Sequence, residues 1–532
     1  MTQRWLDHRH RLVTDDNSRW WTLGAMCIAL FMIMLDNTVV NVALPSIQRD
    51  LKASLSSLEW TVNAYTLTFA VLLVTGGRLG DIFGRRRMFL FGVVVFGISS
   101  AAIGFAPDDH ALVAFRAVQG IGAAFMMPAT LSIITQAFPP HQRGMAIGTW
   151  AGVSALALAI GPVLGGFLTE QVSWRAIFFI NPPIAIGAVA VTLFATRETR
   201  DETVTRKVDL PGIAAITVGL TSIVLALVEG NAWHWGSARV IGLLALAVAS
   251  IVAFAVIERR SAAPMVDFGF FRSRSFLGAN LVAFIVSFAM LAQFFFLALY
   301  MQNVLHYSPL QAGVRFLPAT VLIIIMGPLA GRLTDRVGPR PLMTLGLAVV
   351  ATALFIQSHL TVHTGYGLLL PGFVLMGLGM GLTMSPMSTA AMNSVDRSKA
   401  GVASGVLSMS RMVGGTFGVA VMGALVTAIG RSQIDQQLPN VSASARAAIA
   451  NALGAGASPS HTSAHIVAVA RDAFVSALGT GLTIGAAVTV CGAIVAWALI
   501  QRSPTLAQPE GVAAGAQAPP SLNEVPAELT LV

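Results

Sequence analysis

Four charged side chains lie inside long apolar stretches of this sequence: Asp36, Arg116, Arg315 and Arg411. A charge near the centre of a bilayer costs about 2.5–3.5 kcal/mol on insertion scales, so such residues usually face a protein interior or a cavity. Asp36 is the one carboxylate placed well inside an apolar stretch, and a carboxylate in that position can bind and release a proton. These residue types therefore predict proton-transfer chemistry at a buried site.

We expect Asp36 and Arg116 to approach each other in the outer half of the membrane. Asp36 lies about 16 residues, or roughly 24 Å, from the inner end of its stretch, and Arg116 lies about five residues from the outer end of its own. Burial and a neighbouring arginine change the proton affinity of a carboxyl group in opposite directions. A carboxyl group that moves between these two environments can take up a proton on one side of the membrane and release it on the other. Asp36 is therefore expected to carry a proton whose movement is coupled to that of another molecule. The alternatives are a static buried ion pair, a bond from Asp36 to its own helix, and direct contact with a cationic substrate.

The composition of the chain requires lipid around most of it. Of the 532 residues, 55 % are hydrophobic and 11 % are charged, and the mean hydropathy is +0.74, whereas soluble proteins carry about 25 % charged residues. The net charge of +9 is spread over short loops, so we expect no nucleic-acid partner. The sequence contains no Walker loop, and no histidine lies deep in an apolar stretch, so neither ATP drive, a metal nor another cofactor is expected.

Fourteen apolar stretches are long enough to cross a membrane as helices, which takes about 20 residues each. They are 20–44, 58–79, 88–106, 111–137, 145–168, 176–195, 210–229, 239–257, 276–301, 312–333, 342–358, 366–388, 402–429 and 474–500. Lys and Arg gather in alternate connecting segments, which indicates that these face the cytoplasm. We therefore expect an all-α, multi-pass protein of the inner (cytoplasmic) membrane with both chain ends in the cytoplasm.

A charged turn occurs twice in the chain. GRLGDIFGRRR, Gly77 to Arg87, is followed much later by GRLTDRVGPR, Gly331 to Arg340, and each turn follows an apolar stretch. Such repetition predicts two six-helix bundles on one plan, with the seventh and eighth stretches as a two-helix insert. The expected parts are a tail (1–19), the N-terminal bundle (20–197), the insert (198–262), the C-terminal bundle (263–502) with a long outer loop (430–473), and a disordered tail (503–532).

The repeated turn also has a mechanical interpretation. A carboxylate at this position can bind a helix N-terminus or an arginine, and the glycines permit tight turns and close approach. We interpret the turns as a conformational latch that favours one of two conformations of the protein and breaks in the other. The alternative is that the arginines only set the topology. The latch residues are Gly77, Asp81, Gly84, Arg85, Arg86, Asp335, Arg336 and Gly338.

Four ordered motifs carry a family resemblance that covers nearly the whole chain. They are LDNTVVNVALP (35–45), GRLGDIFGRRR (77–87), RAVQG (116–120) and GPVLGG (161–166). With them the chain resembles the fourteen-helix drug:proton antiporter branch of the major facilitator superfamily. The resemblance implies two six-helix bundles around a central cavity, alternating access between the two sides of the membrane, and export driven by protons.

GPVLGG resembles the core of the antiporter motif of that branch. The full pattern has two earlier glycines; Gly148 matches the first, and Ala157 replaces the second. Small residues create a face for a close helix crossing, and a proline perturbs the helix; the alternative is ordinary small-residue packing. The expected antiporter-helix residues are Gly148, Gly161, Pro162, Gly165 and Gly166.

Substrate contacts are predicted from aromatic, methionine and polar side chains in the apolar stretches. Aromatic faces suit cations, and methionine adapts to many shapes, although such stripes also occur in lipid-facing and core positions. The candidates for the cavity lining are Asn41, Gln119, Phe295, Tyr300, Met384 and Arg411.

These features together predict a proton-coupled exporter that acts as a monomer, not an enzyme. The resemblance implies small lipophilic substrates, often cationic and toxic, with protons and membrane lipid as the other partners. One alternative is an exporter dedicated to a single endogenous metabolite, antibiotic or lipid. Others are an importer on the same fold and a membrane sensor or enzyme.

Overall fold

The computed structural model describes residues 17–53, 55–200, 209–230, 233–261, 268–454 and 464–501. Every regular element among these residues is helical, which confirms the predicted all-α class. The predicted tail 503–532 lies outside the described residues, as does the tail 1–19 except for its last three positions.

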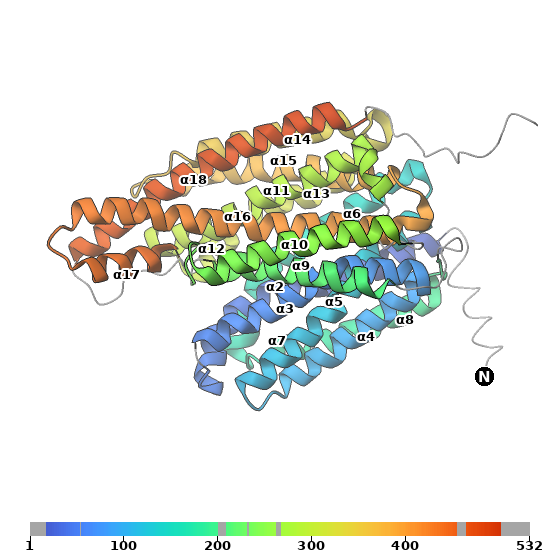
Figure 1. Cartoon of the computed structure of the whole chain (residues 1–532), viewed down its shortest axis with the longest axis horizontal. Helices are drawn as coiled ribbons and strands as arrows, with labels where there is room; N and C mark the ends of the chain where they lie inside the picture. Colours follow the sequence, from blue (N-terminus) through green and yellow to red (C-terminus); the bar gives the residue numbers. More distant parts are fainter. Residues whose placement is uncertain are drawn as a thin grey trace, which may run out of the picture.

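The helices form an N-terminal group, a central pair and a C-terminal group (Figure 1). The N-terminal group comprises α2 (Ser18–Leu51), α3 (Leu55–Phe83), α4 (Arg85–Gly104), α5 (Asp109–Ala137), α6 (Pro140–Gln171), α7 (Ala176–Phe179) and α8 (Asn181–Ala195). The pair is α9 (Leu210–Glu229) and α10 (Ala238–Arg260). The C-terminal group comprises η1 (Phe268–Arg272), α11 (Arg274–Leu299), η2 (Tyr300–Val304), α12 (Pro309–Arg315), α13 (Leu317–Val337), α14 (Pro339–Gln357), α15 (Tyr366–Asn393), η3 (Arg397–Lys399), α16 (Ala400–Gln437), α17 (Ala443–Gly454) and α18 (Ala464–Leu499).

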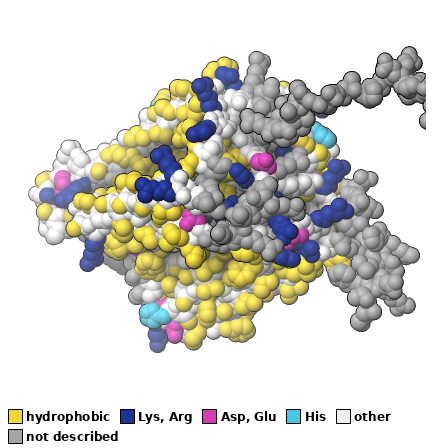
Figure 2. Space-filling view, turned by 45° about the vertical axis from the view of Figure 1, so that its right-hand side comes forward, with side chains coloured by type: hydrophobic (Ala, Val, Ile, Leu, Met, Phe, Trp, Pro, Cys, Tyr) yellow, Lys and Arg dark blue, Asp and Glu magenta, His cyan; other side chains and the backbone are white. Residues whose placement is uncertain are grey.

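Thirteen segments of the described chain are long and apolar enough to cross a membrane. Their outer surfaces suit lipid, because large hydrophobic side chains point away from the protein. On α10, for example, Val248 is 63 % exposed. Figure 2 shows a face on which hydrophobic side chains predominate and charged ones form scattered groups. The count of fourteen spans and the cytoplasmic placement of both ends stay predictions.

The N-terminal and C-terminal groups meet mainly where α6 packs against α13 and where α3 packs against α16, and smaller contacts join α6 to α12 and α15 and α5 to α16. Within the groups, α2 packs on α5 and α6, while α11 packs on α15 and α16. Helices α9 and α10 pack on each other, and α9 also lies against α3 and α16. The pair therefore lies beside the contact between α3 and α16 (Figure 1). This arrangement places the faces of α2, α3, α5, α6, α11, α13, α15 and α16 around the centre of the molecule.

The described residues of the predicted outer loop 430–473 are mostly helical, and its place outside the membrane stays a prediction. Helix α16 continues to Gln437, α17 follows at Ala443–Gly454, and α18 already begins at Ala464. Hydropathy marks where a span leaves lipid, but a helix continues into water until a breaker such as Pro439 follows. The Arg446 guanidinium binds Asp435 at 2.7 Å and so holds α17 against the extended end of α16.

Candidate functional site

Asp36 and Arg116 form a buried ion pair, as their predicted depths required. Arg116 Nη1 on α5 lies 2.5 Å from Asp36 Oδ2 on α2, and both side chains are 1 % exposed. Arg116 also donates from Nε to the Thr61 carbonyl at 2.9 Å. Its guanidinium lies 4.2 Å from the centre of the Tyr65 ring. Three helices, α2, α3 and α5, therefore fix this pair away from solvent.

Two amides complete the coordination of the Asp36 carboxylate. Gln119 Nε2 and Asn181 Nδ2 donate to Asp36 Oδ1 at 2.9 and 3.1 Å. Gln119 was predicted to contact substrate, but it is fully buried and its Oε1 accepts a hydrogen bond from Arg116 at 2.8 Å. Asn181 was not predicted at all. The signal for it was an amide at the start of an apolar stretch, directly before Pro182 and Pro183.

This cluster has the components of a proton switch. The Arg116 guanidinium balances the charge of the Asp36 carboxylate, and the amides of Gln119 and Asn181 donate hydrogen bonds to it. Adding a proton to Asp36 would neutralise the carboxylate and remove the attraction that holds Arg116. Proton binding at Asp36 would thereby be coupled to the contact between α2 and α5.

The first charged turn joins the two groups of helices. Asp81, fully buried on α3, accepts hydrogen bonds from the backbone N–H groups of Gly401 and Val402 at 3.0 and 2.9 Å. These N–H groups open α16, where the helix dipole favours an anion. Arg85 binds the same carboxylate at 2.6 Å and donates to the Ser398 carbonyl. Gly84 has φ of 111°, a left-handed conformation that favours glycine.

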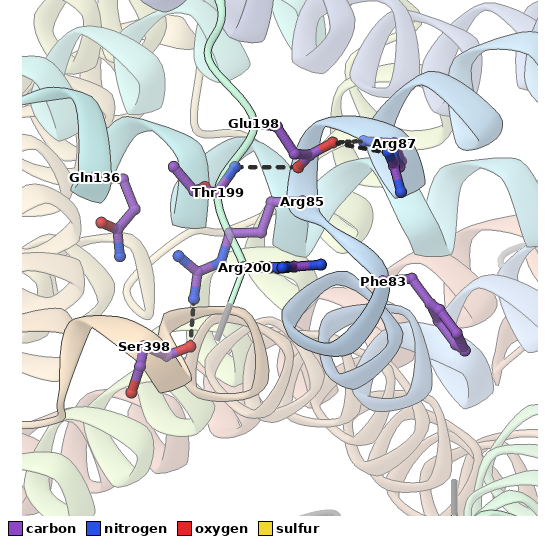
Figure 3. A pocket seen from close by; sticks show the side chains of 8 residues that line it. All are labelled: Phe83, Arg85, Arg87, Gln136, Glu198, Thr199, Arg200 and Ser398. Carbon is purple, nitrogen blue, oxygen red and sulfur yellow. Dashed lines mark hydrogen bonds and ion pairs between the residues drawn. The ribbon is translucent and has the colours of Figure 1, made fainter. Parts of the chain in front are cut away.

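A cavity of about 510 Å³ opens beside this turn (Figure 3). Glu198, which follows α8, caps the first turn of α4 by accepting from the backbone N–H groups of Arg86 and Arg87 at 3.0 and 3.1 Å. The Arg85 N–H donates to the Thr199 carbonyl at 2.9 Å. The segment that leads toward the central helix pair is therefore fixed to the first charged turn.

The second charged turn repeats the first with fewer contacts. Asp335 Oδ1 accepts from the backbone N–H of Gly144, near the start of α6, at 3.2 Å. Gly338 has φ of 84°, matching the role of Gly84. Pro339 stands where the first turn has Arg85, and Arg336 is exposed. The second carboxylate therefore has no arginine equivalent to Arg85 beside it.

Glycines let the backbones of the two groups touch near both charged turns. A Cβ added to Gly77 would lie 2.3 Å from the Gly401 carbonyl oxygen, and one added to Gly144 would lie 2.3 Å from that of Gly331. One added to Gly148 would lie 2.2 Å from the Gly327 oxygen. Any side chain at these positions would separate the helices.

The antiporter-helix glycines lie on two faces of α6, not on one as predicted. Gly148 faces α13, whereas Gly161 and Gly165 face Thr38 and Val39 on α2. The reason is the spacing, because thirteen residues advance a helix by about three and a half turns. Gly166 is half-buried. The side chains of Pro162 and Asn41 lie outside the described residues.

The predicted cavity residues do not form one lining. Tyr300 is fully buried, and its hydroxyl donates to the carbonyls of Thr361 and Thr364 at 2.7 and 2.8 Å, so it anchors the α14–α15 connection. Met384 is buried in the core. Phe295 is 43 % exposed, and Arg411 is half-buried. In the described part of the chain, no three His, Cys, Asp or Glu side chains gather into a metal-binding group.

One ion pair outside the membrane-spanning segments fixes the far end of α2. Asp50 Oδ2 accepts from Trp174 Nε1 at 2.9 Å and pairs with Arg175. These hydrogen bonds lower the pKa of the Asp50 carboxyl below its ordinary value. The loop between α6 and α7 is thus held to α2.

Curated relatives match most of the chain. A tetracenomycin C resistance and export protein of Streptomyces glaucescens is 35 % identical over 502 residues, which cover 92 % of this chain and 93 % of the relative. A puromycin resistance protein of Streptomyces alboniger is 39 % identical over 417 residues, covering 77 % and 82 %. A multidrug resistance protein of Mycobacterium tuberculosis is 36 % identical over 408 residues, covering 76 % of each chain.

Solved structures share the fold at low identity. A proton:xylose symporter aligns with a TM-score of 0.61 at 13 % identity, covering 91 % of this chain and 96 % of the other. A human organic anion transporter aligns with a TM-score of 0.59 at 14 % identity, covering 90 % and 99 %. The model of the Major Facilitator Superfamily matches residues 26–419. The chain therefore belongs to the Major Facilitator Superfamily and is a multi-pass protein of the cytoplasmic membrane.

Proposed function

We propose that this protein is a proton-coupled antiporter that exports small lipophilic toxic compounds by alternating access. The observation that carries the proposal is the Asp36 cluster, a titratable carboxylate shielded from solvent between helices that line the centre of the fold. The names of the relatives, which include a tetracenomycin C export protein and a multidrug resistance protein, support export of antibiotic-like molecules.

The proton would act through the partner of Asp36. Ionised Asp36 holds Arg116, and protonated Asp36 releases it, so the packing of α5 against α2 depends on proton occupancy. Loading from the outside and release to the inside would tie each proton to one conformational cycle. Antiport follows if substrate binds best to the deprotonated state.

In this proposal the conformation described above is the one closed toward the cytoplasm. Asp81 and Asp335, on the predicted inner face, each bind backbone N–H groups of the opposite bundle. Opening inward would break both sets of contacts. In this proposal residues 20–197 and 263–502 are the two moving bundles, 198–262 is the two-helix insert, and the protein works as a monomer without enzymatic activity.

A dedicated exporter of one metabolite is the second candidate. It is favoured by the tetracenomycin C export protein, which bears the name of a single compound and matches 92 % of this chain. A narrow substrate range in the assay below would select this alternative.

The test uses inside-out membrane vesicles with a pH gradient and two dyes, cationic ethidium and anionic fluorescein. Wild type is expected to accumulate at least one dye, to release protons when dye is added, and to stop when a protonophore is present. Asp36→Asn should lose coupled accumulation. Asp50→Asn is the matched control, because Asp50 is an exposed carboxylate at the end of the same helix.

Proton release and dye transport that persist in Asp36→Asn would sink the proton role of Asp36. Accumulation that a protonophore leaves unchanged would remove proton coupling altogether. If well-expressed wild type moves neither dye, broad export fails and only the dedicated exporter remains.

A further inference from the structure

Arg411 is a charged side chain without a counter-charge, about three turns into α16 from its first residue. No hydrogen bond, ion pair or aromatic contact links it to any other residue that the structure describes, and it is half-buried. Arg116 and Arg315 differ, because the first pairs with Asp36 and the second lies 3.8 Å from the centre of the Tyr307 ring. An uncompensated charge inside a membrane protein is costly, which marks Arg411 as a functional group.

The neighbours of Arg411 on α16 show which way it points. Ser410 donates to Asn280 on α11 at 3.0 Å, and Gly414 faces Phe284 of the same helix. Gly405 faces α3. At about 100° per residue, Arg411 lies about 60° from Gly414 and 100° from Ser410, and about 120° in the other direction from Gly405, so it points between these contacts with α11 and the contact with α3.

The opposite side of α16 faces outward. Phe417 is 38 % exposed and packs on Phe284 and Phe288 at the outer edge of the α11–α16 seam. It lies about 120° around the helix from Arg411, beyond the α11 contact. Arg411 therefore projects to the inner side of that seam, toward the centre of the fold.

Space is accessible next to Arg411. Gly415 follows it on the same side of α16 and faces Leu291 of α11. Leu291 is 40 % exposed. An exposed apolar side chain therefore packs one helical turn along α16 from the unpaired guanidinium.

We infer that Arg411 is the charge-selecting residue of the substrate site and that it favours lipophilic substrates carrying an acidic group, such as a carboxylate or phenolate. A guanidinium binds such oxyanions through paired N–H donors, and the neighbouring apolar surface accommodates a hydrophobic body. This substrate class is opposite in charge to the cationic one expected from family resemblance. The inference rests on the proposed export function for its biological meaning but concerns binding alone.

The test measures binding to the purified full-length protein by fluorescence anisotropy at pH 7.5, without any gradient. The probes are fluorescein and rhodamine 6G, which share a xanthene ring but carry opposite charge. Wild type is expected to bind fluorescein more tightly than rhodamine 6G. Arg411→Gln should weaken fluorescein binding by about tenfold or more, with rhodamine 6G unchanged or tighter. The fluorescein affinity of Arg411→Lys should lie between those of wild type and Arg411→Gln, because lysine keeps the charge without the paired donors.

Arg431→Gln is the matched control, since Arg431 is an exposed arginine on the same helix. It should change neither affinity. The inference is overturned if wild type prefers rhodamine 6G, if it binds neither dye, or if Arg411→Gln weakens both dyes equally, which would indicate a role in shape and not in charge.

Binding and export fail separately in these experiments. Fluorescein binding through Arg411 without proton-coupled accumulation in vesicles would keep this inference and reject the proposed function. Coupled accumulation of ethidium with no charge preference at Arg411 would do the reverse.

Discussion

Asp81 on α3 accepts a 3.0 Å hydrogen bond from the backbone N–H of Gly401 on α16. The two residues belong to different bundles, and both backbones approach closely because Gly77 adjoins the same contact. A buried carboxylate held by N–H groups of a helix N-terminus and by Arg85 is a charge-assisted cluster, which is stronger than neutral hydrogen bonds. Closure of the predicted inner face thus depends on a few polar contacts set among glycines.

Replacing Asp81 should open the inner face more than replacing Asp335. Asp81→Asn weakens contacts with two N–H groups and removes the attraction of the Arg85 guanidinium bound at 2.6 Å, whereas Asp335→Asn weakens contacts with the Gly144 and Met145 N–H groups and loses the longer-range attraction of Arg143. Hydrogen bonds to charged groups contribute about 1.5–3 kcal/mol, so Asp81→Asn should raise the open population about tenfold or more.

The measurement is the labelling rate of a Ser404→Cys reporter by a membrane-impermeant maleimide in inside-out vesicles. Ser404 is fully buried on α16, and Cys491 is replaced by Ser because it is exposed. Labelling that is equal in both aspartate variants, or faster in Asp335→Asn, contradicts the unequal strength of the two turns.

Gly148→Ala should destabilise the closed state. The added methyl would lie 2.2 Å from the Gly327 carbonyl oxygen, so α6 and α13 must separate. The same reporter should label faster, and transport should fall because one half of the cycle is disfavoured. Gly187→Ala provides the control, since nothing lies within 4 Å of a Cβ there. Equal labelling of wild type and Gly148→Ala would show that α6 adjusts without opening.

Single and double replacements separate stability from function at the Asp36 cluster. Arg116→Met leaves a buried carboxylate without its counter-charge, which should cost about 3–5 kcal/mol and lower the melting temperature. Asp36→Leu combined with Arg116→Met should recover much of that stability, since an apolar pair needs no counter-charge. Transport should stay absent in the double variant. A stable double variant that still exchanges protons for dye would place the coupling elsewhere.

The Asp50 ion pair at the outer end of α2 should make a small, pH-dependent contribution to the free energy of unfolding. Its pKa is lowered by the Trp174 and Arg175 hydrogen bonds, so it stabilises the fold above the ordinary aspartate pKa of about 3.9, and the benefit disappears as pH falls through the lower folded value. The side chain is 48 % exposed, so the effect should stay within about 1 kcal/mol. Melting curves of wild type and Asp50→Asn should differ at pH 7 and converge toward pH 3; a constant or growing difference would contradict this.

The sequence predicted the ion pair but not its surroundings. The depths of Asp36 and Arg116 along apolar stretches placed both in the same half of the membrane, because helix rise fixes depth. The amide of Asn181 reaches Asp36 through the packing of α8 on α2, a contact between residues 145 positions apart. A single sequence carries no rule that sets such tertiary contacts. The contacts of Gln119 with Asp36 and Arg116 depend on its rotamer in the same way, which its position in the sequence does not define.

The repeated turns show a second limit of the same kind. The similarity of the two turn sequences was enough to match Asp81 to Asp335. Both carboxylates accept hydrogen bonds from backbone N–H groups of the opposite bundle. The contact of Arg85 with the Ser398 carbonyl depends on where α16 starts, which hydropathy does not define. Hydropathy likewise does not define where a helix such as α16 ends outside lipid, because lipid imposes no pattern there.

The two aspartates have an implication for how such a chain can arise. Asp81 lies in the first bundle and binds a helix start in the second, while Asp335 lies in the second and binds a helix start in the first. Contacts exchanged in this way are self-complementary, like those across a twofold axis between identical subunits. An ancestral half-length protein could therefore have closed on a second copy of itself through the same surface. Once both halves share one chain, each side can change independently, and the two turns indeed differ at this position, with Arg85 in the first and Pro339 in the second.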